Sequence, residues 1–220
     1  MDRTRVNLRA LMAIFGVLVA TMMFGPTVGS ARAAVAGAAG DAVSVGDPNS
    51  LGQIDLYVDP MCPFSGKFIT EQGTEMNKHL EDGTLHINLR FVNFLERLSA
   101  SGTYDARAIY AAYVVADQAR SSDVTWRFVQ LIFSPEHQPK EKGSSDLSND
   151  QLADLAGEAG APAAAQDLIR MGLPIGFDPK AIASANLDVL HGFPESGVPM
   201  VVIDGQPVDT DSDWMARLPA

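Results

Sequence analysis

The sequence predicts an α/β protein in which a βαβ unit and a C-terminal ββα unit are separated by a helical insertion. Alternating apolar residues over 53–58 and 84–94 flank a stretch with helical spacing, and the spacing is again helical between 99 and 190. Near the C-terminus the strand pattern returns on both sides of Asp204-Gly205, a dipeptide typical of a two-residue hairpin turn. Strands on either side of a block of helices indicate one interrupted α/β fold.

The first 33 residues have the layout of a secretory signal peptide. Arg3, Arg5 and Arg9 precede an uncharged apolar run over 10–24, and small residues then lead to Ala33. This run is shorter than the roughly 20 residues that a membrane-spanning helix needs. An uncleaved anchor stays open as an alternative, and membrane contact is expected only in that case. Residues 34–49 are rich in Ala, Gly and Ser without a period, which predicts a flexible linker.

The chain is acidic, with 16 basic and 27 acidic residues among 220. Cleavage after Ala33 leaves 12 basic and 26 acidic residues, a net charge of −14. Nucleic acid is therefore not expected as a partner. Solubility outside the cell accounts for the acidity, and a preference for basic client proteins is a second interpretation.

Residues 50–98 are expected to form the first part of the fold. The strand over 53–58 is followed by Pro63, which suits the first turn of a helix because its missing N–H is not needed there. That helix should end at Asp82-Gly83, and the strand over 84–94 comes next. The two strands of such a βαβ unit are expected to be parallel neighbours.

The insertion spans residues 99–190, and residues 191–220 form the second part of the fold. Helices are expected over 104–118, 124–133, 149–159, 162–171 and 179–190. The polar stretch 135–148 between them is predicted to be a solvated connection. Strands are expected over 198–203 and 206–208, with a short closing helix near Trp214.

Cys62 is the only cysteine, so no internal disulfide can form. It stands directly after the first strand and before the first helix, where unpaired N–H groups and the helix dipole favour a thiolate. This position predicts a reactive nucleophile with a lowered pKa. A buried cysteine that serves as a small apolar residue is the alternative.

The segments Cys62-Pro63-Phe64-Ser65 and Gly197-Val198-Pro199 resemble the thioredoxin superfamily, and most closely its exported DsbA-type thiol-disulfide oxidoreductases. The resemblance spans about residues 50–210 and implies a thioredoxin-like fold. It also implies that Cys62 is the attacking thiolate and that Pro63 and Phe64 tune it. Pro199 would be a cis-proline facing Cys62, and the Val198 backbone would pair with an extended client. A proline at a strand edge is the alternative for Pro199.

Two positions depart from the family pattern. Ser65 replaces the second cysteine, so the site can neither store a disulfide nor release a mixed one, although its hydroxyl can donate a hydrogen bond to the thiolate. Leu56 stands where many members carry a buried acid, and Asp59 is interpreted as a turn or cap residue. Net oxidation of clients is therefore not expected. Reduction of mixed disulfides and isomerisation of wrong ones remain possible, with an external low-molecular-weight or protein thiol as the resolving partner.

Other interpretations of the chain stay open. Without a second thiol, the protein could be a non-catalytic binding or chaperone-like module for extended polypeptides. Ser65 could also be a substitution that traps mixed disulfides, in which case ordinary dithiol activity belongs to the original protein. His79, His86, His137 and His191 lack metal-ligand spacing, so neither a metal nor another cofactor is expected. The expected location is secreted or extracytoplasmic.

Overall fold

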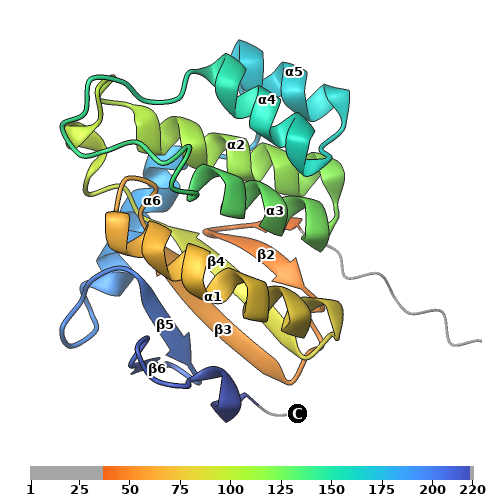
Figure 1. Ribbon diagram of the computed structural model, residues 1–220, viewed down its shortest axis with the longest axis vertical. Coiled ribbons are helices and arrows are strands. Elements are labelled where there is room, and N and C mark those ends of the chain that lie inside the picture. The colour runs from red at the N-terminus through yellow and green to blue at the C-terminus, as the bar shows by residue number, and fades with distance from the viewer. Residues whose placement is uncertain (1–36, 219–220) are drawn as a thin grey trace, which may run out of the picture. The chain divides into compact units, whose positions relative to one another are not determined.

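A computed structural model describes residues 37–218 of the protein, and the predicted signal peptide over 1–33 lies outside the described residues. The described chain forms a six-stranded sheet with the order β1-β2-β4-β3-β5-β6 (Figure 1). Its strands are β1 (Gly37–Ala39), β2 (Ala42–Gly46), β3 (Gly52–Val58), β4 (Leu85–Phe91), β5 (Met200–Ile203) and β6 (Gln206–Val208).

The centre of the sheet confirms the predicted βαβ and ββ units. Strands β3 and β4 are parallel, and α1 (Pro63–Glu81) connects them. Strand β5 pairs antiparallel with β3, and β6 with β5. Asp204 and Gly205 both have positive φ angles, 51° and 75°, as a tight hairpin turn between twisted strands requires. The predicted closing helix is only the short 3-10 helix η2 (Met215–Arg217).

The prediction of a flexible linker over residues 34–49 is wrong for β1 and for its pairing partner β2. This strand lies antiparallel to β4, and Val43 and Val45 are completely buried. The ordered fold therefore begins before residue 50. Small residues flank the strand on both sides, so its short alternation of apolar residues is not distinct in the sequence. Besides the three-residue β1, its pairing partner is β4, about 40 residues further along the chain, so only the folded sheet reveals the strand.

The helical insertion agrees with the prediction to within two residues at each helix end. Its helices are α2 (Tyr104–Ala119), α3 (Ser122–Ile132), α4 (Asn149–Ala159), α5 (Ala163–Met171) and α6 (Pro179–Leu190). Buried residues of α2 to α6 belong to the same apolar cluster as those of α1 and the central strands. The insertion thus extends the core of the sheet rather than forming a separate one.

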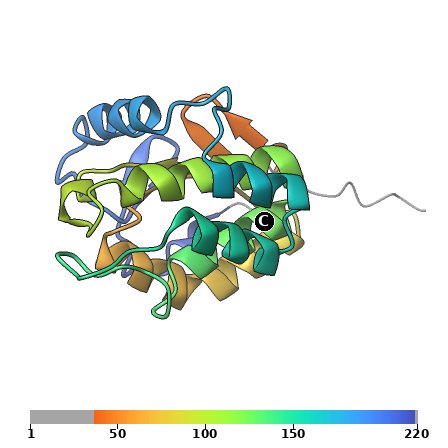
Figure 2. The same ribbon diagram turned by 90° about the horizontal axis from the view of Figure 1, so that it is seen from above.

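Helices α1 and α6 lie on opposite sides of the sheet (Figure 2). The alternation along β3 explains this arrangement, because Leu56 joins the cluster that contains Phe68 of α1, whereas Tyr57 joins the one that contains Leu190 of α6. A short 3-10 helix η1 (Glu96–Leu98) and the start of α2 follow β4. The carboxyl end of β3, the start of α1 and the start of α2 therefore lie close together, and the predicted site is located there.

Candidate functional site

Cys62 is the N-cap residue of α1, with Pro63 at the first helical position as expected. Its φ and ψ angles of −73° and 118° are those of extended backbone, so the thiol leaves the chain where the strand segment becomes helix. The side chain is 4% exposed, and Sγ lies 3.6 Å from the carbonyl oxygen of Val198. The Val198–Pro199 peptide bond is cis. The fold thus brings the two predicted motifs together across 136 residues, and the roles of these residues stay predictions.

Phe64 and Ser65 differ sharply in their surroundings. The Phe64 ring is 68% exposed beside the thiol, where an incoming chain can contact it. Ser65 is completely buried, and its hydroxyl oxygen accepts a hydrogen bond from the Asp59 N–H at 3.4 Å. Ser65 therefore faces the interior beneath Cys62.

The expected lowering of the Cys62 pKa is wrong, because burial outweighs the helix terminus. Loss of hydration disfavours the thiolate and raises the pKa above its ordinary value of 9.0. The N–H groups of Ser65 and Phe64 and the Ser65 hydroxyl oppose this effect, whereas the negative charge of Asp59 adds to it. The thiolate is therefore less favoured than that of a free cysteine, so a base that accepts the proton would assist attack on a disulfide.

Asp59 is a turn residue, one of the two roles that the sequence indicates, and its burial gives its carboxyl group a further property. Its two carboxylate oxygens accept hydrogen bonds from the N–H groups of Met61 at 2.8 Å and Leu95 at 3.1 Å. The side chain is completely buried. Burial raises the pKa of Asp59 to about 6, and the hydrogen bonds limit the rise. Asp59 can therefore accept a proton near neutral pH.

Asp105 is a component of the site that sequence reasoning missed. It lies in the first turn of α2, where an acidic residue usually only complements the helix dipole. Here it is completely buried, and neither carboxyl oxygen has a hydrogen-bond partner among the described residues. Burial, followed by the charge of Asp59, raises its pKa to about 9. A buried carboxyl group without donors is stable only when protonated, and the charge of Asp59 adds to this effect, so Asp105 holds a proton.

The two carboxyl groups form an acid pair, Asp59 and Asp105, that carries one proton and one negative charge at neutral pH. Leu56, at the position where many family members have an acid, is a completely buried core residue. The acid pair places a titratable group near Cys62 from other positions, one in the turn after β3 and one in α2. No sequence pattern links these two residues, because they are 46 positions apart and meet only in the fold.

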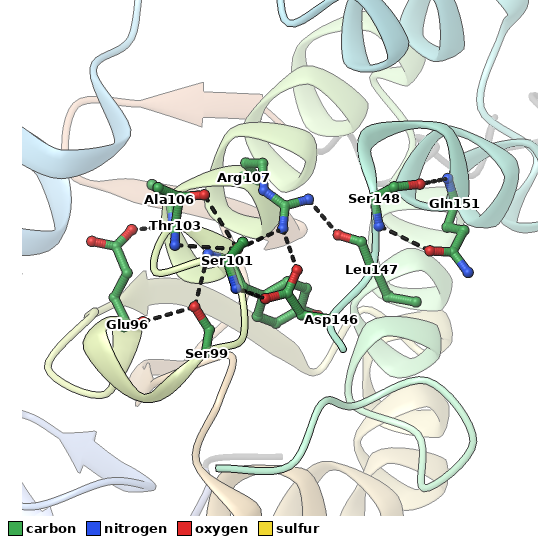
Figure 3. Close-up of polar contacts among 11 residues, drawn as sticks. Glu96, Ser99, Ser101, Thr103, Ala106, Arg107, Asp146, Leu147, Ser148 and Gln151 are labelled. Carbon is green, nitrogen blue, oxygen red and sulfur yellow. Dashed lines mark hydrogen bonds and ion pairs between the residues drawn. The ribbon is translucent and has the colours of Figure 1, made fainter. Parts of the chain in front are cut away.

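A polar network fixes the start of α2, and with it Asp105 (Figure 3). The Ala106 N–H donates to the Glu96 carboxylate at 3.1 Å, and the Arg107 guanidinium pairs with Asp146 at 2.6 Å. Arg107 also donates a hydrogen bond to the carbonyl of Leu147. Asp146 and Leu147 belong to the polar stretch 135–148, so the network holds this stretch against the helix.

The same polar stretch reaches the site, which corrects its interpretation as a merely solvated connection. The side-chain amide of Gln138 donates hydrogen bonds to the carbonyl oxygens of Pro60 at 3.1 Å and Cys62 at 2.9 Å. A Cβ atom on Gly66 would collide with the amide group of Gln138, so a larger residue there would displace this side chain. Gln138 therefore fixes the backbone on both sides of Met61.

Two grooves meet at the cis-proline, since Val198, Pro199 and Thr210 line both. The first, of about 310 Å³, is bounded on its α1 side by Phe64, Lys67, Phe68, Glu71 and Gln72. The second, of about 480 Å³, continues past Glu195, Pro207 and Asp209. Cys62 lines neither groove, but Val198, whose carbonyl oxygen contacts the sulfur, lines both.

Within residues 37–218, no helix is long and apolar enough to cross a membrane. The same residues contain no group of three or more His, Cys, Asp or Glu side chains arranged to hold a metal ion.

Two solved structures, of MdbA and DsbA, share this fold and are 25% and 27% identical in sequence to the chain. MdbA, a thiol-disulfide oxidoreductase from Corynebacterium matruchotii, is 25% identical with a TM-score of 0.70, over 85% of this chain and 92% of that one. DsbA from Mycobacterium tuberculosis is 27% identical with a TM-score of 0.64, over 77% and 85% of the two chains. The chain is a DsbA-like member of the thioredoxin superfamily. The predicted thioredoxin-like fold with an inserted helical region is thereby confirmed.

No protein-family model matches this DsbA-like chain. Curated relatives are the serine/threonine-protein kinases PknE of Mycobacterium tuberculosis and Mycobacterium bovis, which are 33% identical over 180 residues. The match covers 81% of this chain but only 31% of the kinases, so the chain spans about a third of their length.

Proposed function

We propose that this protein is an exported thiol-disulfide exchange protein that works through Cys62 alone. The observation that carries the proposal is the contact between the Cys62 sulfur and Val198, directly before a cis-proline. The structural neighbours with 25–28% identity that are named as thiol-disulfide oxidoreductases support it. The predicted signal peptide supports a location outside the cytoplasm.

The exchange begins when Cys62 attacks a disulfide of a client protein. The Cys62 S–H bond breaks, a new disulfide forms between Cys62 and one client sulfur, and the other sulfur leaves as a thiolate. The Cys62 proton passes to the Asp59 carboxylate and then to the leaving thiolate, so the acid pair returns to its starting charge. Because Ser65 has no thiol, the mixed disulfide persists until another thiol attacks it.

The resolving thiol decides the outcome. If a second thiol of the client attacks its own mixed-disulfide sulfur, Cys62 is released as a thiol and the client disulfide is isomerised without net redox change. If a small external thiol or another protein attacks, the client sulfur moves to that thiol and Cys62 is again free. Clients with disulfides and an external thiol are therefore the proposed partners.

The direct test is formation of a mixed disulfide by the purified protein. Incubation with a peptide joined to glutathione through a disulfide should add the mass of one partner to the protein, and a reductant should remove it. The variant Cys62→Ala gains no mass in the same assay. An unmodified wild-type protein after prolonged incubation at pH 8.5, where a thiol with a raised pKa is partly ionised, would contradict the proposal.

The raised pKa of Cys62 and the buried Ser65 favour one alternative, a non-catalytic module that holds extended polypeptides in the grooves beside Pro199. Under this alternative Cys62→Ala leaves client binding unchanged. Loss of client capture in this variant, with its unfolding curve unaltered, argues for exchange instead.

A further inference from the structure

The grooves beside the cis-proline carry an excess of negative charge. Between Lys180 and Arg217 the sequence has no lysine or arginine, but it has six acidic residues. Glu195 and Asp209 line the second groove and Asp211 lines the first, and all three are exposed. The acidity of the whole chain is therefore also present where a client must lie.

Three acids of the grooves have no cationic partner among residues 37–218, unlike several acids elsewhere on the protein. Asp41 and Asp55 both pair with Arg90, and Asp146 pairs with Arg107. Glu195, Asp209 and Asp211 form no ion pair with any residue in the described part of the chain. The Asp209 carboxylate only accepts the N–H of Asp211 at 3.0 Å, which keeps its negative charge.

Among the described residues, Lys67 is the one cation that lines the grooves, and a carboxylate already compensates its charge. The Lys67 ammonium lies 3.9 Å from the carboxylate of Glu71, and both residues bound the first groove. Apart from Glu195, Asp209 and Asp211, the remaining lining side chains are apolar or neutral, including the exposed ring of Phe64. The surface around Cys62 thus combines an apolar contact with three unpaired negative charges.

We propose that the preferred clients are extended segments with lysine or arginine within a few residues of the reacting cysteine. An extended chain advances about 3.3 Å per residue, so such side chains reach the edges of grooves that meet beside the sulfur. Unpaired carboxylates attract them and repel acidic segments, which changes both the encounter rate and the choice of client. This inference rests on the proposed function for its covalent step, while the charge preference of the grooves stands without it.

The test compares two disulfide-bearing peptides that differ only at the residues flanking cysteine, two lysines in one and two glutamates in the other. The lysine peptide should form the mixed disulfide with Cys62 at least about tenfold faster at low salt. The difference should shrink strongly at 1 M salt, where the screening length is about 3 Å rather than about 30 Å. Equal rates for the two peptides at low salt would overturn the inference.

Charge-neutral variants locate the effect. The triple variant Glu195→Gln/Asp209→Asn/Asp211→Asn should lose most of the peptide preference, a change of about three- to tenfold. The matched control Glu81→Gln/Asp82→Asn/Glu158→Gln removes three exposed charges at the end of α1 and in α4 and should keep the preference. A triple groove variant that discriminates as well as the control contradicts the inference.

A non-covalent measurement separates this inference from the proposed exchange chemistry. Protein with Cys62→Ser is titrated with the same two peptides carrying serine in place of cysteine, and amide NMR shifts report binding. Tighter binding of the lysine peptide, with shifts at residues 195–211, supports the charge preference even if wild-type protein forms no mixed disulfide. Equal affinity, or no shift with either peptide, overturns it.

Discussion

Replacing Asp105 by asparagine should change how the stability of the protein depends on pH. The folded protein keeps this carboxyl group protonated up to a pKa of about 9, whereas the unfolded chain releases the proton near 3.8. As pH rises between these values, the unfolded state becomes more favourable because it alone can ionise. The free energy of unfolding therefore falls with rising pH, and Asp105→Asn removes this contribution because asparagine does not titrate.

The size of the effect follows from one proton bound in the folded state and none in the unfolded state. This difference lowers the free energy of unfolding by about 1.4 kcal/mol per pH unit, or roughly 2.7 kcal/mol between pH 6.5 and 8.5. Asp59, with a pKa of about 6, ionises in both states over most of this range and contributes little to the slope. The free energy of unfolding of the wild type should thus fall by this amount relative to that of Asp105→Asn between pH 6.5 and 8.5.

Urea unfolding followed by tryptophan fluorescence measures the difference, because Trp126 and Trp214 are both completely buried. Glu158→Gln, which removes an exposed carboxyl group in α4, is the control and should keep the wild-type slope. Wild type and Asp105→Asn with parallel pH profiles between 6.5 and 8.5 would refute the assignment of a buried, protonated carboxyl group.

Four other substitutions address the site itself. The rate of Cys62 alkylation by iodoacetamide should reach half its maximum above pH 9. Asp59→Asn should lower this midpoint, because the aspartate charge disfavours the thiolate. An unchanged midpoint would show that the charge of Asp59 does not affect the pKa of the thiol. Gln138→Ala removes two hydrogen bonds and should cost about 1–3 kcal/mol of unfolding free energy. Gly66→Ala displaces the same side chain, so the double variant should cost less than the sum of the two single variants in chemical denaturation, whereas strict additivity would show that the contact is unimportant. Ser65→Cys should create a dithiol that air or a mild oxidant converts to an internal disulfide with the loss of two mass units, and a variant that keeps two free thiols would mean that the buried Ser65 position cannot approach Cys62.

The sequence predicted most of the fold because the relevant signals are local. The helix limits follow from apolar spacing, from Pro63 and Pro179 at first helical positions and from Ser148, which caps α4 together with Gln151. The parallel pairing of β3 and β4 follows from the connection through α1. Strand β2 was not predicted, because its five residues show little periodicity and become a strand only when β4 lies beside them.

The residues of the candidate site also form two groups, those that a local motif reveals and those that only the fold reveals. Cys62 and Pro199 could be found in the sequence because each stands in a recognisable motif. Asp105 and Gln138 could not, because an acid in a first helical turn and a glutamine in a polar stretch are ordinary at those positions. Their contacts with the backbone and side chains around Cys62 exist only in the folded chain.

By itself the sequence determined that the protein has a single cysteine, at the start of a helix, in a thioredoxin-like fold. Tertiary structure decided how readily that thiol ionises. Burial raises the pKa of Cys62 instead of leaving it lowered by the helix terminus, and a buried acid pair assembled from the turn after β3 and from α2 lies near it. The physical reason is that hydration is lost through packing by distant segments, and the cost of burying a charge depends on how completely they exclude water.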